Sequence, residues 1–350
     1  MKLNDAISGL IGPGAPPLAR QPGFRWSLPR AALPVAIMAA LALVPLLAEL
    51  AGQPFYITLV TRILIFALAA TGLNLVLGYG GMISMGHALY IGVGAYAVGI
   101  LSSYGVTSGW IHLGAALACG GLIALLIGAI SLRTSGVGYI MITLAFAQML
   151  YFLVVSLRQF GGDDGLPLAS RSDFSGLPLS NPNVLYYLVF VVLAVTLYCF
   201  RRLVHARFGM LLRGAKCNPR RMAALGFPLL RYRLLAYVIS AQVCVIAGLL
   251  MANLTNFVSP SYMHWAVSGE LLVMVVLGGL GTLMGPVVGA LCMLILEEVL
   301  SSLPFTLPYG LDEVVRSHWL GLMGLFIIVV TLALRRGLYG ALIAGKEKLS

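Results

Sequence analysis

The feature that most constrains this chain is a series of apolar stretches, each close to the roughly 20 residues that a helix needs to cross a bilayer. They occupy residues 31–51, 57–77, 83–103, 110–132, 138–157, 183–200, 234–253 and 318–334. Hydrophobic residues make up 60% of the chain and charged residues 9%, whereas a soluble domain carries about 25% charged residues. The same balance excludes intrinsic disorder, which needs low hydrophobicity and high charge. The sequence therefore predicts an all-α integral membrane protein.

A further apolar stretch, residues 269–303, is too long for one span. As a single helix it would be about 52 Å long, against a hydrocarbon core of about 30 Å. Glycines at 278, 279 and 281 and the Gly285-Pro286 pair interrupt it, and both residue types break helices. We therefore divide it into a broken or short pair, 269–281 and 286–303, which gives about ten membrane segments. The first member is short enough to re-enter the membrane as well as to span it.

Positive charges gather on one side of this arrangement. If the N-terminus is cytoplasmic, eighteen Lys and Arg residues fall in inside segments and three (Arg158, Arg171 and Arg316) in outside loops. Cytoplasmic loops of membrane proteins are enriched in these residues. Both termini are thus predicted to be cytoplasmic, with tails at 1–30 and 341–350 around a transmembrane domain at 31–340. The net charge of +11 marks this face and requires no nucleic acid.

The cytoplasmic loop 201–233 carries nine Lys and Arg residues and no acid. Within it, Asn218 suits a helix N-cap, Pro219 the first helical position and Gly226 the residue after the helix end. Between these signals the chain has the residues of a two-turn helix: Arg220, Arg221, Met222, Ala223, Ala224 and Leu225. Met222, Ala223 and Leu225 are predicted to form a small apolar surface that nothing else in the loop covers. A helix this short needs something to pack against. The loop either contacts lipid headgroups or presents a docking helix for a cytoplasmic partner.

A second notable segment is rich in glycine. Residues 78–88 have the sequence GYGGMISMGHA, and small residues at this density let helices approach closely. The sequence predicts a solute path beside this segment, with five polar lining residues: Asn74, Ser84, His87, Thr143 and Gln148. His87 taken alone is better explained as a neutral imidazole that is hydrogen-bonded between helices.

The stretch Leu77–Gly81 is echoed by Leu277–Gly281. Such echoes can mark paired broken helices around a transport site. Because glycine is common in membrane chains, coincidence explains the echo equally well.

No constellation for catalysis, cofactor binding or metal binding is found. The sequence contains no HExxH, GxSxG or CxxC motif, and the glycine-flanked run at 340–346 has Glu347 where a phosphate-binding loop needs Ser or Thr. No ladder of carboxylates crosses the apolar segments, which argues against coupling to an ion gradient. The chain is predicted to be a non-catalytic transport subunit that draws energy from a partner.

Five segments, in order along the chain, resemble the branched-chain amino acid ABC importer permeases, specifically their longer, M-type member. They are 78–88, 139–148 (YIMITLAFAQ), 161–166 (GGDDGL, which departs at Asp163 from the family's GGSDGL), the stretch from Arg207 to Gly226, and the stretch from Ser268 to Pro286. The resemblance covers roughly residues 57–340.

The resemblance implies a permease in a bacterial inner membrane, with 31–340 as the permease domain. It implies four kinds of partner: a second homologous permease, two cytoplasmic ATPases that bind ATP and magnesium, a periplasmic solute-binding protein and the lipid bilayer. Residues 218–223, 225 and 226 would then form the ATPase-coupling helix. The solute would be a branched-chain or other hydrophobic amino acid, although family members also move urea, short amides or aromatic acids. The alternatives are a passive gated channel for a small polar solute such as urea or an amide and, less well supported, an intramembrane enzyme.

The charge distribution predicts which loops are accessible from outside the cell. The loops 158–182 and 304–317 are predicted to be periplasmic. A cysteine introduced by Ser175→Cys should therefore react with a membrane-impermeant thiol reagent in intact cells. A cysteine introduced by Ser350→Cys should react only after the membrane is opened. The opposite labelling pattern would reverse the orientation.

Overall fold

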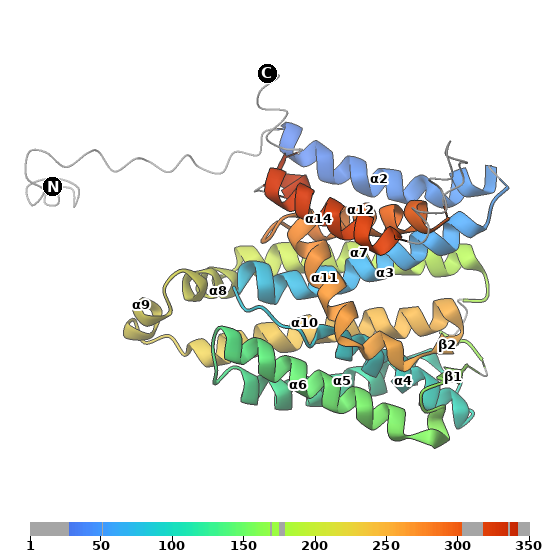
Figure 1. Cartoon of the computed structure of the whole chain (residues 1–350), viewed down its shortest axis with the longest axis horizontal. Helices are drawn as coiled ribbons and strands as arrows, with labels where there is room; N and C mark the ends of the chain where they lie inside the picture. Colours follow the sequence, from blue (N-terminus) through green and yellow to red (C-terminus); the bar gives the residue numbers. More distant parts are fainter. Residues whose placement is uncertain are drawn as a thin grey trace, which may run out of the picture. The chain divides into compact units, whose positions relative to one another are not determined.

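The computed structural model describes residues 28–50, 52–168, 170–174, 179–302, 318–334 and 337–341 (Figure 1). Residues 1–27 of the predicted N-terminal tail, the outer loop 304–317 and the C-terminal tail from 342 onwards lie outside the described residues, as do the labelling positions Ser175 and Ser350. The chain forms two compact units, Met1–Leu41 and Ala42–Ser350. The fold and the site below concern the second unit.

Each of the ten predicted segments contains a helix. They are α2 (Leu28–Leu50), α3 (Phe55–Asn74), α4 (His87–Ser103), α5 (Gly109–Ser131), α6 (Val137–Ser156), α7 (Pro182–His205), α10 (Leu229–Thr255), α11 (Trp265–Gly278), α12 (Gly285–Ser302) and α14 (Trp319–Ala333). Six of them are long and apolar enough to cross a membrane: α2, α3 with its extension to Tyr79, α5, α6, α7 and α10. The all-α membrane class is confirmed, and the count of ten membrane segments stays a prediction.

Strand structure among the described residues is confined to a pair of two-residue strands. β1 (Leu166–Pro167) pairs antiparallel with β2 (Phe257–Val258). Short 3-10 turns, η2 (Arg158–Phe160) and η3 (Pro260–Met263), lie nearby in the chain. This group lies at the end of the second unit opposite to α8 (Arg207–Cys217) and α9 (Pro219–Ala224) (Figure 1). The described part of the predicted outer loop 158–182 and the basic loop 201–233 are therefore at opposite ends of the second unit.

Several predicted boundaries are wrong. A π-helical turn, η1 (Leu75–Tyr79), extends α3 beyond residue 77, whereas residues 83–86 are not helical and α4 begins only at His87. α7 and α10 also run into the predicted loop 201–233, since α7 ends at His205 and α10 begins at Leu229. An apolar pattern stops at the first arginine, but a helix does not, because arginine is a good helix former and favours the last turn.

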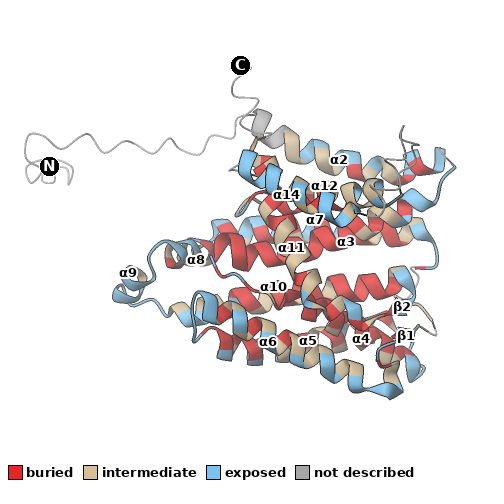
Figure 2. Ribbon diagram, viewed as in Figure 1, coloured by how far each residue is buried: buried red, intermediate tan, exposed pale blue. Residues whose placement is uncertain are grey.

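The buried core is centred on two helices, α3 and α10 (Figure 2). Of these, α10 packs against α3 and also against α4 and α5. Glycines allow two of these helices to approach closely. A Cβ on Gly94 of α4 would lie 2.0 Å from the Val245 carbonyl oxygen, and one on Gly248 of α10 would lie 1.9 Å from the Ile91 carbonyl oxygen. Large apolar side chains of α5, α6 and α7 point outward instead, as expected where lipid is the solvent.

Candidate functional site

The chain is irregular between α3 and α4. The π-turn η1 ends at Tyr79 and is followed by Gly80 and Gly81, and residues 80–86 form no helix before α4 begins. The His87 ring is bonded through Ser240 to the Gly72 carbonyl oxygen, so α4 begins level with Gly72, about 10 Å along the helix from Tyr79. The segment 80–86 therefore returns toward the middle of the bundle without helical structure.

Side chains of two neighbouring helices and of the break itself accept hydrogen bonds from the backbone here. The Met85 amide donates to Thr143 Oγ1 of α6 (3.3 Å), the Gly86 amide to Ser84 Oγ (3.4 Å) and the Ala88 amide to Ser268 Oγ of α11 (3.0 Å). Non-helical backbone inside a membrane protein is tolerated only where such partners are found. The break is therefore stabilised by specific hydrogen bonds and is a defined part of the fold.

His87 lies at the centre of this region and is fully buried. Ser240 Oγ donates to the Gly72 carbonyl oxygen (2.6 Å) and so accepts from His87 Nε2–H (2.9 Å). His87 Nδ1 then accepts from Ser84 Oγ (2.9 Å). This network needs a neutral imidazole, and it joins the segment before α4 to α10 and α3.

Aromatic rings enclose the imidazole. Tyr90 and Tyr237 lie edge-on to it, with ring centroids 6.0 and 5.5 Å away. The two tyrosines are also edge-on to each other, and the Tyr90 hydroxyl donates to the Tyr237 hydroxyl (3.0 Å). The rings shield the polar network from lipid, where an unsatisfied polar group costs several kcal/mol.

A second contact joins the two similar glycine-rich stretches, Leu77–Gly81 and Leu277–Gly281. We call this contact, of Gly78 with Gly281 and Thr282, the glycine junction. A Cβ on Gly78 would lie 2.5 Å from the Gly281 nitrogen, so only glycine fits there. Asn74 holds the junction from one side: its Nδ2 donates to the Thr282 carbonyl oxygen (2.8 Å), and its Oδ1 accepts from the Gly281 amide (3.1 Å). The sequence left coincidence open for this echo, and the structure shows that its two members touch.

The predicted break in 269–303 is confirmed. α11 ends at Gly278, residues 279–284 are not helical, and α12 begins at Gly285. The helices then pack closely, because a Cβ on Gly289 would lie 1.9 Å from the Met274 carbonyl oxygen. The end of η1, which leads into the break at 80–86, therefore meets the second break, at 279–284, at the glycine junction.

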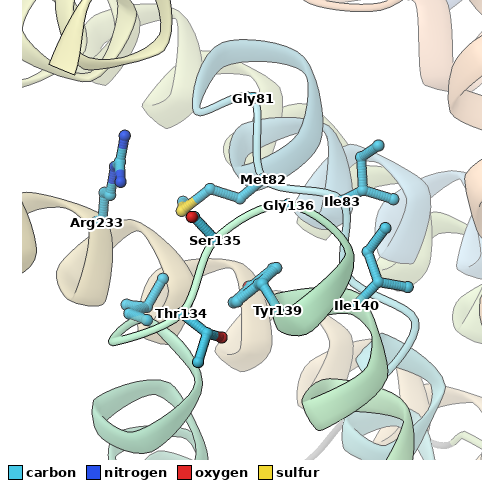
Figure 3. Close-up of a pocket in the computed structure, with 10 residues that line it drawn as sticks. Gly81, Met82, Ile83, Thr134, Ser135, Gly136, Tyr139, Ile140 and Arg233 are labelled. Atoms are coloured by element: carbon cyan, nitrogen blue, oxygen red, sulfur yellow. The ribbon is translucent and has the colours of Figure 1, made fainter.

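A cavity of about 160 Å³ lies beside the first break (Figure 3). Three parts of the chain surround it, namely residues 81–83, the turn between α5 and α6 with the start of α6, and Arg233 of α10. Its polar side chains are those of Thr134, Ser135, Tyr139 and Arg233. Arg233 Nε is buried and has no hydrogen-bond partner among the described residues.

The five predicted path residues do not form one group. Ser84, His87 and Thr143 meet at the first break, whereas Asn74 lies at the glycine junction. Gln148 is half-buried on α6, and its Nε2 has no hydrogen-bond partner among the described residues. Sequence reasoning missed Ser240, Tyr237 and Ser268, and also Tyr96 of α4, whose buried hydroxyl lacks a partner there too. Nothing in their local sequence distinguishes them from other polar residues of apolar helices.

The structure forms the predicted short helix as α9, one residue shorter than expected because Leu225 is its C-cap. Asn218 Oδ1 accepts from the Arg221 amide (2.9 Å), and Pro219 is the first helical residue. At the other end Gly226 has φ +82, its amide donates to the Ala223 carbonyl oxygen (2.9 Å), and the Phe227 amide donates to that of Met222 (3.3 Å). This is the Schellman geometry.

One part of the predicted surface of α9 is wrong. Met222 is half-buried because its side chain packs on Gly214 of α8, within 3.0 Å of the position of an added Cβ. The helix α8, which sequence reasoning did not find, therefore covers it. Ala223 and Ala224 stay exposed, and Leu225 is 65% exposed. The amphipathic spacing of Gly209, Leu212 and Ala215, which α8 buries, was the signal that could have revealed it.

A helical bundle with two broken helical connections, a close glycine contact between them and a capped helix projecting at one end defines a multi-pass membrane protein of the transporter class. Residues 55–332 match the family described as branched-chain amino acid transport system / permease component, so the chain belongs to this family. Within the described residues, no group of three or more His, Cys, Asp and Glu side chains is placed to hold a metal ion.

Three relatives illustrate the similarity. The chain is 26% identical to LivM of Escherichia coli, a high-affinity branched-chain amino acid transport system permease protein, over 74% of this chain and 68% of LivM. It is 26% identical to a probable LivM of Methanocaldococcus jannaschii over 77% of this chain and 88% of that protein. It is also 26% identical to E. coli LivH, a second permease protein of that system, over 68% and 82%. No solved structure matches the chain significantly.

The His87 network makes a prediction about stability. Ser240→Ala leaves the buried His87 Nε2–H without an acceptor, which should destabilise the protein by about 1–2 kcal/mol. The control is Ser103→Ala, which removes an exposed hydroxyl bonded within its own helix and should change stability by less than about 0.5 kcal/mol. Thermal unfolding of the purified protein in detergent measures both. Equal midpoints for the two variants would contradict the assigned network.

Proposed function

We propose that this chain is the permease subunit of a binding-protein-dependent ABC importer in a bacterial inner membrane. It forms a path with a second, homologous permease for branched-chain or other hydrophobic amino acids. Two cytoplasmic ATPases bind ATP and magnesium and supply the energy, and a periplasmic binding protein delivers the solute. Membership of the family supports this proposal, as does similarity to both LivM and LivH, two permease proteins of one transport system.

The observation that carries the energy coupling is α9. Its two caps hold it as a rigid rod, while its apolar residues Ala223, Ala224 and Leu225 are exposed at the predicted cytoplasmic end. Phe227 and Met210 add further exposed apolar surface on the same loop. Apolar side chains that project into water among arginines are typical of a protein-binding surface. A groove on an ATPase subunit would cover them.

The solute path is proposed to run beside α4, as the glycine-rich sequence suggested. Among the five predicted lining residues, Gln148 is the strongest candidate, because its buried amide nitrogen has no partner in the described part of the chain. Tyr96, on the neighbouring helix α4, offers a similar hydroxyl. Asn74, Ser84, His87 and Thr143 already bond within the protein, so they would shape the path more than bind the solute.

The test is Leu225→Asp. A carboxylate in place of this side chain would have to be buried against an apolar groove, which is costly for a charged group. We expect binding of the ATPase to weaken by about 2 kcal/mol or more, roughly thirtyfold, while the permease still inserts into the membrane. Co-purification of the ATPases and ATP-driven uptake measure the two effects.

The comparison variant is Arg220→Gln on the same helix. Because Arg220 is exposed, removing its charge should change binding by less than about 1 kcal/mol. If the Leu225→Asp variant bound the ATPases as tightly as the wild type does, the proposed docking role of α9 would be wrong. Solute uptake that continues at an unchanged rate without ATP would instead show a passive channel.

A further inference from the structure

We propose that Lys216 is a positioning residue that connects the ATPase-docking helix α9 to the glycine junction. A displacement of α9 would then reach the point where the end of η1 meets the break at 279–284. This inference rests on the proposed function, because it assumes that an ATPase moves α9.

Lys216 lies in the last turn of α8, two residues before the N-cap of α9. Its Nζ donates to the Gly78 carbonyl oxygen (2.8 Å). Its side-chain stem crosses Gly81, where an added Cβ would lie 2.7 Å from Lys216 Cγ. Gly81 also has φ +68, which L side chains rarely adopt. The absence of a side chain at residue 81 thus leaves room for the lysine to reach residue 78.

The Gly78 carbonyl is available because of the π-turn. The amides of Gly80, Met82 and Gly81 donate to the carbonyls of Leu75, Val76 and Leu77, respectively. Among the described residues, the donor to the next carbonyl, that of Gly78, is Lys216. A cation at the carboxyl end of a helix is favoured by the helix dipole, and an ammonium–carbonyl bond is stronger than a neutral one. π-turns are rare and often mark functional positions.

The same glycine makes the contact with the second break. Gly78 receives Lys216 at its carbonyl oxygen and packs on Gly281 with its Cα. Asn74, one turn earlier, bonds Gly281 and Thr282. Three steps therefore lead from α9 to the 279–284 loop: the short link to α8, the Lys216 bond and the Gly78–Gly281 contact. All three are direct contacts between described residues.

The end of α8 is also tied to α10. Arg233 donates to the Ala215 carbonyl oxygen (3.2 Å), next to Lys216 in the chain. A movement of α9 cannot be absorbed at this end of α8 without straining one of the two bonds. A lysine that served only to neutralise a helix end would affect stability and would leave the coupling between ATP hydrolysis and uptake unchanged. That difference makes the inference testable.

The experiment uses the assembled importer in lipid vesicles, with leucine as the solute probe, and compares Lys216→Met with wild type. Methionine keeps the apolar stem over Gly81 and removes the ammonium. We expect normal co-purification of the ATPases and continued ATP hydrolysis, but a fall of about tenfold in leucine moved per ATP, the scale of one charge-assisted hydrogen bond. Lys216→Arg, which keeps a donor, should restore at least part of it. Arg231→Gln, which removes an exposed charge at the start of α10, should match wild type.

Three other results would overturn the inference. Wild-type leucine transport per ATP in Lys216→Met would show that the bond carries no coupling. Loss of ATPase binding in that variant would place Lys216 in the docking surface itself. A fall of the same size in Arg231→Gln would show a general effect of charge. Failure of the proposed function is distinguishable, because the wild-type chain would then bind no ATPase or would transport leucine without ATP.

Discussion

Backbone amides and carbonyls inside a bilayer must find partners within the protein, and the site depends on how this chain meets that requirement. The segment 80–86 leaves helical geometry in the middle of the bundle, and beyond Met82 its amides no longer bond to the preceding turn. Hydroxyl groups of Thr143, Ser84 and Ser268 accept from them or from the first turn of α4. Because these donors and acceptors come from different helices, the break also fixes how α4, α6 and α11 pack.

Glycine supplies the second requirement, which is space. At the glycine junction, Gly78 allows two irregular segments to come together, and Asn74 satisfies both an amide and a carbonyl that would otherwise be exposed. Close approach and hydrogen bonding support each other there, since a side chain at residue 78 would collide with the Asn74 amide. The junction is thus a defined contact, which α8 can reach through Lys216.

The sequence predicted the elements whose signals are local. The apolar runs located the helices of the ten predicted membrane segments, and the Gly-Pro break divided 269–303 correctly. Asn218, Pro219 and Gly226 marked the ends of α9. Contacts between parts of the chain that are distant in sequence could not be predicted. Asn74 bonds to residues more than 200 positions away, and no periodicity in the sequence encodes such a pairing. For the same reason Lys216 and Ser240 were missed, and Met222 was assigned to an exposed surface because the helix that covers it had not been found.

Hydrogen–deuterium exchange at the glycine junction tests the central claim most directly. In the wild-type protein the Gly281 amide, held by Asn74 Oδ1 at 3.1 Å, should exchange slowly. In Asn74→Leu it should exchange about tenfold faster or more, because one hydrogen bond is lost and the irregular segment opens locally. Protection of α10 should stay unchanged and shows that the variant is folded. Equal exchange at Gly281 in both proteins, with α10 protected, would contradict the account.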